Sequence, residues 1–248
     1  MIMNGEMPPS RSPQSDRAEW VRHLRRLNEQ EEDALASVYD ERWGEIESTH
    51  REFVERFLSL LPPDGTVLDA ACGTGKYFGV VLATNRFVVG VDHSAGYLAV
   101  AAAKFPEVVT EKRHLQDLPF ERIFDGVMCI DAMEMVPPED WPVVLARFSQ
   151  ALHPGGWLYL TIELVRQEEV VALNEAARRR GLPVVAGEVW EDSGYHFYPA
   201  IDQVRSWMGD AGFVIEAEAE EPWHDDGYSY RHVLSRLAPE SGSRTGSL

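Results

Sequence analysis

The sequence predicts an α/β fold with a doubly wound, mostly parallel sheet and an antiparallel C-terminal edge. Strand and helix patterns alternate between residues 66 and 163, as in sheets whose parallel strands are joined by helices. Val67–Ala70 and Phe87–Val91 are nearly continuous apolar runs, which is typical of strands covered on both faces. The last two strands follow closely in sequence, so we expect them to pair antiparallel.

Seven strands are expected in this sheet, over residues 66–70, 87–92, 107–111, 124–130, 157–163, 213–220 and 229–237. Helices are expected over 75–83, 94–104, 138–152, 165–180 and 201–211. Ser94 suits the N-cap of the second helix, and Gly181 and Gly212 end the last two. Residues 184–190 and 195–198 predict a hairpin inside a small lid insertion at about 182–199.

The chain before the sheet predicts a helical cap. Apolar side chains recur near helical spacing over residues 19–61, and Pro62-Pro63 ends the pattern. We therefore expect a cap at 18–63 and a main domain at 64–238. The polar segments 1–17 and 239–248 are expected to be disordered tails.

Composition narrows the range of partners and locations. The 248 residues carry a formal charge of −18, which disfavours binding to nucleic acid, since phosphate backbones attract clustered Lys and Arg. Cys72 and Cys129 do not suggest a disulfide framework. The polar N-terminus is unlike a signal peptide, and no apolar run suits a membrane span. We expect a cytoplasmic protein without a membrane partner, and leave a homodimer open.

The segment Val67–Tyr77 predicts a strand, a glycine turn and the start of a helix. Gly73 and Gly75 allow unusual φ angles and a close approach of backbone to a ligand. Asp92 ends the next strand, where it would accept hydrogen bonds from two ribose hydroxyls. Asp69 would repel a pyrophosphate but attract the ammonium group of S-adenosylmethionine (SAM). A dinucleotide is disfavoured because Gly79 comes one residue too late for its fingerprint.

These motifs resemble the class I SAM-dependent methyltransferases that act on small molecules. The resemblance covers about residues 64–163, through Val67–Tyr77, Val88–Asp92, His114–Phe120, Phe124–Val136 and Leu152–Thr161. It implies a Rossmann-like seven-stranded fold, SAM as cofactor and S-adenosylhomocysteine (SAH) as product. Residues 31–61 resemble the family's N-terminal helix, which covers the cofactor.

The resemblance also implies roles for single residues in holding SAM. Asp69 and the backbone of Ala71 and Gly73 would hold the methionine part, and Asp92 the ribose, with His93 flanking the adenine or ribose. Asp117 would accept a hydrogen bond from the adenine amino group, with Gln116 and Leu118 beside it. The backbone carbonyl of Ile130 would lie near the methionine amine, and Met133 would lie near the sulfonium. Asp117 is otherwise a turn residue.

Aromatic residues on the cap form another candidate part of the cofactor site. Tyr39 and Trp43 are four residues apart and share one helix face. They would form either a lid over the cofactor or part of the core.

Candidate bases follow the fourth strand, at Asp131 and Glu134. Many relatives have a histidine pair at the positions of Glu134 and Met135, which this chain lacks. Glu134 would bind a cationic acceptor or take a proton, or else cap the next helix.

His196, in the insertion, is a further candidate base because its side chain titrates near neutrality. Strand alternation would put Tyr195 and Phe197 on one face and His196 and Tyr198 on the other. Only one of these pairs can face the pocket. No metal site is expected, although His224-Asp225-Asp226 superficially resembles one.

The expected function is methyl transfer from SAM to a nitrogen or oxygen atom of a small organic acceptor, aromatic or from secondary metabolism. One alternative is a SAM-binding protein of the same fold that catalyses another reaction or serves as a structural subunit. A methyltransferase for peptides or nucleic acids is the other. Methylation of adenine or of an amide nitrogen is disfavoured because Ile130–Met133 does not match an Asn-Pro-Pro-Tyr motif.

Overall fold

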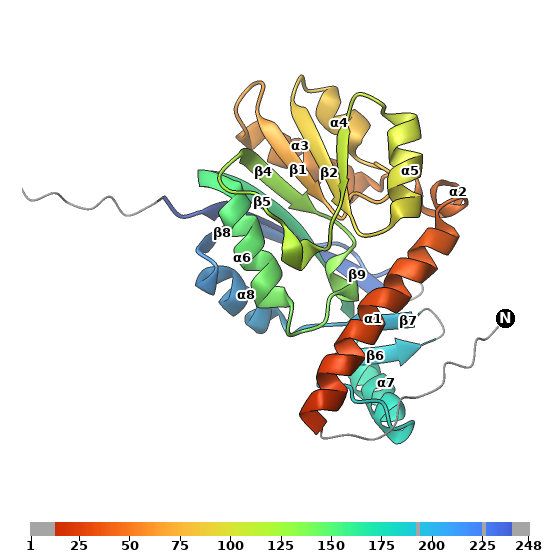
Figure 1. The fold of residues 1–248 in the computed structure, drawn as a ribbon. Helices are drawn as coiled ribbons and strands as arrows, with labels where there is room; N and C mark the ends of the chain where they lie inside the picture. Colours follow the sequence, from red (N-terminus) through yellow and green to blue (C-terminus); the bar gives the residue numbers. More distant parts are fainter. Residues whose placement is uncertain (1–12, 192–193, 225–226, 240–248) are drawn as a thin grey trace, which may run out of the picture.

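The computed structural model describes residues 13–191, 194–224 and 227–239. Its centre is a seven-stranded sheet in the order β3-β2-β1-β4-β5-β9-β8 (Figure 1). The strands are β1 (Thr66–Ala70), β2 (Phe87–Asp92), β3 (Val109–Lys112), β4 (Phe124–Cys129), β5 (Leu152–Val165), β8 (Phe213–Glu220) and β9 (Tyr228–Leu237). Strands β1 to β5 pair in parallel, whereas β9 pairs antiparallel with β5 and β8. The predicted fold class is confirmed.

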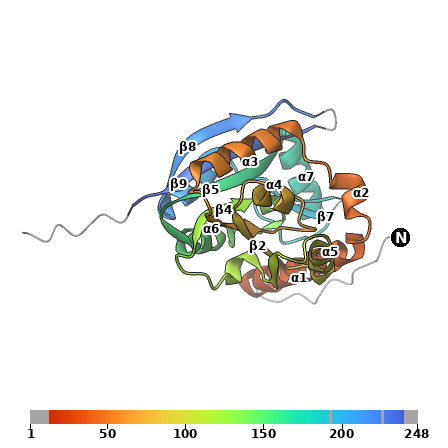
Figure 2. The same cartoon turned by 90° about the horizontal axis from the view of Figure 1, so that it is seen from above.

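Helices cover both faces of the sheet (Figure 2). Helices α3 (Ser48–Leu60), α4 (Phe78–Leu82) and α5 (Ala95–Lys104) pack on one face around Phe57 and Phe78. Helices α6 (Trp141–Ala151) and α8 (Ile201–Asp210) pack on the other around Trp141 and Met208. Consecutive residues of β1 point to opposite faces, so Val67 joins the first cluster and Leu68 the second.

The N-terminal cap is divided into three helices. They are α1 (Pro13–Leu35), α2 (Tyr39–Trp43) and α3. The chain turns between them because α1 runs beside the carboxyl ends of the strands, whereas α3 packs on a face of the sheet (Figures 1 and 2). Helix α1 begins inside the segment expected as a tail, and Arg17 anchors its first turns through hydrogen bonds to Glu139 and Glu188. Residues 1–12 and 240–248 lie outside the described residues.

The first crossover differs from its sequence prediction. A helix was expected from Gly75, but α4 begins only at Phe78, and residues 71–77 form a loop. Ala71, Gly73 and Gly75 have φ angles of 64°, 53° and 76°. A right-handed helix cannot contain such angles, so the helix starts after the last of them.

The insertion follows α7 (Gln167–Arg179) and contains the predicted hairpin, β6 (Glu188–Glu191) and β7 (Gly194–Phe197). Its turn, residues 192–193, lies outside the described residues. Cys72 and Cys129 are both buried and unpaired with each other. Among the described residues, none of the helices has the length and apolar character that a membrane crossing requires.

The close packing of α3 on β4 yields a stability prediction. A Cβ atom at Gly126 would lie 2.5 Å from the Phe57 ring and 2.8 Å from Leu61 Cδ1. We expect Gly126→Ala to lower the free energy of unfolding by about 1–3 kcal/mol, measured by urea denaturation, because it overpacks this contact.

Gly209→Ala is the matched control. An added Cβ at this position of α8 meets nothing within 4 Å, so we expect no loss and a gain of up to about 1 kcal/mol from helix propensity. Wild-type stability in Gly126→Ala would contradict the described packing of α3.

Candidate functional site

A cavity of about 1270 Å³ lies where β1, β2 and β4 end. In an open α/β sheet, the carboxyl ends of the parallel strands are where ligands bind. Helices α1, α2 and α3, the hairpin, the end of β5 and the start of β9 also contribute to its wall. Eleven predicted site residues line it: Tyr39, Trp43, Ala71, Gly73, Asp92, His93, Gln116, Ile130, Asp131, Glu134 and His196.

The loop after β1 brings bare backbone to the cavity. A Cβ at Gly73 would meet nothing within 4 Å, so this position opens onto unfilled space. The Gly73 N–H donates to Asp92 Oδ2 at 2.9 Å, and the Ser94 N–H donates to Asp92 Oδ1 at 2.8 Å. A carboxylate accepts about four hydrogen bonds, so Asp92 keeps acceptor capacity for a ligand. Burial raises its pKa.

Asp69 lies just behind this loop, and its surroundings leave part of its carboxyl group without a hydrogen bond. It is 1% exposed, and its Oδ2 has no hydrogen-bond partner. Burial and, after it, the charge of Asp92 raise the pKa of Asp69 to about 8. A buried acid with an orphaned oxygen implies a missing donor or cation nearby.

One end of the cavity is walled by imidazoles and an acid. His93 stacks on His114 at a ring distance of 5.6 Å, and its Nε2 lies 3.0 Å from Glu32 Oε2. Gln116 lines the same region. Burial lowers the pKa of His93, but the Glu32 interaction more than offsets this, and the net shift is upward.

Five predicted cofactor residues do not line the cavity. Leu118 and Met133 are buried in the core, and Asp117 is exposed outside the wall. Gly75 faces Phe78 and Ala101, so its lack of a side chain serves the turn and its packing. Asp69 is the fifth, and it lies behind the wall. The described placement therefore puts Asp117, Leu118 and Met133 outside the cavity wall.

The aromatic pair on α2 forms part of the wall. The Tyr39 ring lies 5.2 Å from Trp43 and 4.9 Å from Tyr97. Trp43 is 45% exposed, which favours a cover over the cavity rather than a core position. Residues 71–77, which follow β1, are called the glycine loop below. Asp40 fixes α2 to this loop by accepting a hydrogen bond from the Thr74 hydroxyl at 2.5 Å.

Glu134 is the most unusual acid of the cavity. It is 8% exposed, and its Oε2 has no hydrogen-bond partner. Burial raises its pKa well above the usual range, and the charges of Glu163 and Asp131 raise it further. Helix α6 begins only at Trp141, so Glu134 does not cap it, and the alternative of a capping role is wrong.

Asp131 is held by a network of its own. Its φ of 51° turns the chain sharply after β4, and its backbone N–H donates to Thr161 Oγ1 at 2.7 Å. His50 Nε2 lies 2.9 Å from Asp131 Oδ1. Burial opposes ionisation of Asp131, but the hydrogen bond and charge of His50, the charge of Lys76 and the Thr161 hydrogen bond together outweigh it, and the pKa is lowered.

The hairpin turns one of its two faces to the cavity. Tyr195 and Phe197 are buried in the core, where the Tyr195 hydroxyl donates to Glu188 at 2.6 Å. His196 and Tyr198 line the cavity, with parallel rings 5.8 Å apart. Burial lowers the pKa of His196, so its imidazole is neutral at neutral pH.

Some cavity residues were not singled out from the sequence. Helix α1 presents Asn28, Glu32 and Leu35 at helical spacing, a stripe that periodicity could have revealed. Tyr77 also lines the cavity, and nothing in the local pattern around it marks it. His50, which also lines the cavity, proves to be the partner of Asp131.

Comparisons with known proteins agree with this geometry. A family model described as a methyltransferase domain matches residues 67–156, the segment that contains β1, β2, β4 and the glycine loop. Matches to the curated relatives span between 30% and 83% of those proteins' lengths.

Two relatives and one solved structure illustrate the similarity. The ubiquinone/menaquinone biosynthesis C-methyltransferase UbiE of Campylobacter jejuni is 25% identical over 73% of this chain and 83% of its own. A dTDP-4-amino-2,3,4,6-tetradeoxy-D-glucose N,N-dimethyltransferase of Saccharopolyspora spinosa is 28% identical over 50% of this chain and 49% of its own. A SAM-dependent methyltransferase structure from Methanosarcina mazei has a TM-score of 0.62 at 16% identity, over 75% of this chain and 97% of that one.

Asp92 lines the cavity whereas Asp117 does not, and this difference yields a binding prediction. We expect Asp92→Ala to weaken the affinity for SAH by at least about tenfold, roughly 1.4 kcal/mol, because Asp92 lines the cavity with spare acceptor capacity. Asp117→Ala should leave the affinity unchanged. Calorimetric titration of both variants, after circular dichroism has verified their folding, checks this. A loss confined to Asp117→Ala would contradict the described site.

Proposed function

Since the chain belongs to the class I SAM-dependent methyltransferases, we propose that its acceptor is a small organic amine, methylated on nitrogen. The observation that carries the proposal is the buried, partly unsatisfied carboxylate of Glu134, surrounded by further acids.

The residues of the glycine loop fit SAM. The space over Gly73, the acceptor capacity of Asp92 and the orphaned oxygen of Asp69 suit its methionine and ribose parts. When bound, SAM supplies a methyl group already activated on a sulfonium. Tyr39 and Trp43 would cover it and exclude water.

The acceptor end of the cavity is acidic. Asp131, Glu134 and Glu163 line it together, and the charged neighbours that act most on Glu134 are other acids, Glu163, Asp131 and Glu32. A carboxylate or phosphate acceptor would be repelled there. An ammonium group would relieve the repulsion between these acids, since buried charges need partners of opposite sign.

Aromatic rings surround the same end. Tyr198, Tyr228 and Tyr230 line it with His196. Such rings attract cations over their faces and stack on planar groups. An amine carried on an apolar or aromatic skeleton therefore matches both the charge and the surface of the cavity.

An ammonium group must lose a proton before its nitrogen can attack a methyl group. Glu134, whose raised pKa makes it a stronger base than an ordinary glutamate, is the acceptor for that proton. Asp131 already accepts hydrogen bonds from His50 and Thr161, which suits it to orient the acceptor rather than to take the proton. His196, whose imidazole is neutral, also faces the cavity and is a second group that can accept the proton.

Transfer of labelled methyl from SAM to matched acceptors tests the function. We would compare an amine, a phenol and a carboxylic acid built on one aromatic skeleton, together with a small-molecule extract. Mass spectrometry of the labelled product should locate the methyl group on nitrogen. A methyl ester, a C-methyl product, or label in macromolecules alone would overturn the proposal.

Replacement of Glu134 tests the role of the carboxylate. We expect Glu134→Gln to lower kcat/KM for the amine by about 10²-fold or more without changing SAH affinity. In the wild type, kcat/KM should fall as the pH drops through the raised pKa of Glu134, because the protonated group neither attracts an ammonium nor accepts a proton. This dependence should be absent in Glu134→Gln.

The free energy of unfolding should change with pH in the direction opposite to that of kcat/KM. A raised pKa in the folded state means that the contribution of Glu134 is present below the usual glutamate pKa and is lost as the pH rises. Glu134→Gln should therefore unfold no more easily than the wild type at neutral pH.

Glu55→Gln, at an exposed position of α3, is the control for both the kinetic and the unfolding measurements. Wild-type kinetics in Glu134→Gln would contradict the assigned role.

A further inference from the structure

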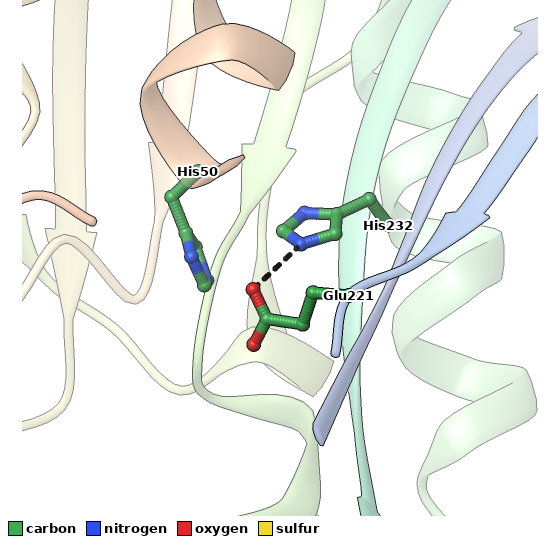
Figure 3. A group of neighbouring side chains, drawn as sticks. All are labelled: His50, Glu221 and His232. Atoms are coloured by element: carbon green, nitrogen blue, oxygen red, sulfur yellow. Dashed lines mark ion pairs between the residues drawn. The ribbon is translucent and has the colours of Figure 1, made fainter. Parts of the chain in front are cut away.

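A second group of polar side chains lies between α3 and the antiparallel edge of the sheet. His50 of α3, His232 of β9 and Glu221, just after β8, converge there (Figure 3). One possible ligand atom from each lies within 4.8 Å of the other two. The three residues are 2%, 0% and 6% exposed, so this is a buried cluster.

Each histidine of the cluster has one nitrogen held and one without a hydrogen-bond partner. His50 Nε2 is bonded to Asp131, and His232 Nδ1 shares a hydrogen bond of 2.9 Å with the Tyr159 hydroxyl. His50 Nδ1 and His232 Nε2 have no hydrogen-bond partner. Histidines that bind metals have this arrangement, because a second partner on the far nitrogen fixes the tautomer and orients the ring.

His232 Nε2 faces Glu221 but is too far from it for a hydrogen bond. The distance to Glu221 Oε2 is 3.6 Å, beyond the range of such bonds. A fully buried imidazole nitrogen normally has a partner. A cation between the two groups would supply it.

The backbone holds Glu221 firmly in this place. Its N–H donates to the Tyr230 carbonyl at 3.0 Å, and its own carbonyl accepts from the Ser229 hydroxyl at 2.7 Å. Its other carboxylate oxygen, Oε1, lies 2.9 Å from His224 Nε2. The ligand atoms are thus carried by fixed elements, as a metal site requires.

We propose that His50, Glu221 and His232 form a binding site for a divalent transition-metal ion of the zinc type. Two imidazole nitrogens and one carboxylate oxygen are a donor set that zinc prefers, at distances of about 2.0–2.2 Å.

The site lies next to the cavity and connects to it through one residue. His50 lines the cavity and bonds to Asp131. An ion on His50 would join α3 to β9 and hold the His50–Asp131 pair in one orientation. The proposal stands on this cluster alone and does not depend on the identity of the acceptor.

Zinc titration of the full chain tests the proposal. The protein, freed of any affinity tag and treated with a chelator, is titrated with zinc chloride in a calorimeter. We expect one ion per chain, and a rise in the thermal midpoint that depends on zinc concentration, since a ligand that binds the folded state stabilises it. Glu221→Gln and His232→Gln should each weaken binding by at least about tenfold.

His114→Gln is the matched control, because His114 lines the cavity but is outside the cluster, and it should bind zinc as the wild type does. His224→Gln distinguishes the cluster from the neighbouring group of Glu47, Glu221 and His224. If His224→Gln abolishes binding and His232→Gln does not, the proposed ligand set is wrong. Absence of zinc binding to the wild type would also overturn it.

X-ray absorption on the zinc-loaded wild type needs no variant and therefore remains informative if a substitution prevents folding. Two imidazoles and a carboxylate around zinc are expected. A shell of water oxygens alone would contradict the proposal.

Discussion

The burial of acidic side chains at the carboxyl edge of the sheet is the constraint on which the rest of the site depends. Asp69, Asp92 and Glu134 are each at most 8% exposed, and each has a raised pKa because burial opposes its ionisation. Such a group persists only where hydrogen bonds or a cationic ligand compensate it. Backbone N–H groups compensate Asp92. Asp69 and Glu134 each retain an oxygen without a partner.

The two unsatisfied acids explain why both ligands of the proposed reaction carry positive charge. Asp69 lies behind the loop that fits the methionine part of SAM, and Glu134 lies where an amine acceptor would enter. Backbone geometry makes this arrangement possible, because Ala71, Gly73 and Asp131 adopt left-handed angles at the strand ends. These angles are unfavourable for residues other than glycine, which is consistent with strain kept at a functional site.

Local patterns predicted the parts of the molecule that depend on neighbouring residues. The strand, glycine turn and acid at Asp69, Gly73 and Asp92 follow from short-range sequence, as does the cap at Ser94, whose hydroxyl accepts from the Tyr97 N–H. Strand alternation left two choices for the hairpin, and packing of Tyr195 into the core decides between them. That packing depends on Glu188, which is fixed by Arg17 from the far end of the chain.

Other features could not be predicted from the sequence because they depend on the path of loops or on distant contacts. Asp117 was placed at the adenine by resemblance, yet the short helix that carries it turns the carboxylate outward. His50 and His232 meet only because α3 packs against β9, and no spacing rule relates them. The break between α2 and α3 likewise follows from the position of α2 over the glycine loop.

A crystal structure of the chain with SAH and an amine acceptor would test the central claim most directly. The account predicts ribose hydroxyls within hydrogen-bond distance of Asp92, the sulfur directed toward the acidic end, and the amine nitrogen beside Glu134. An acceptor nitrogen placed away from Glu134, or SAH bound without contact to Asp92, would contradict it.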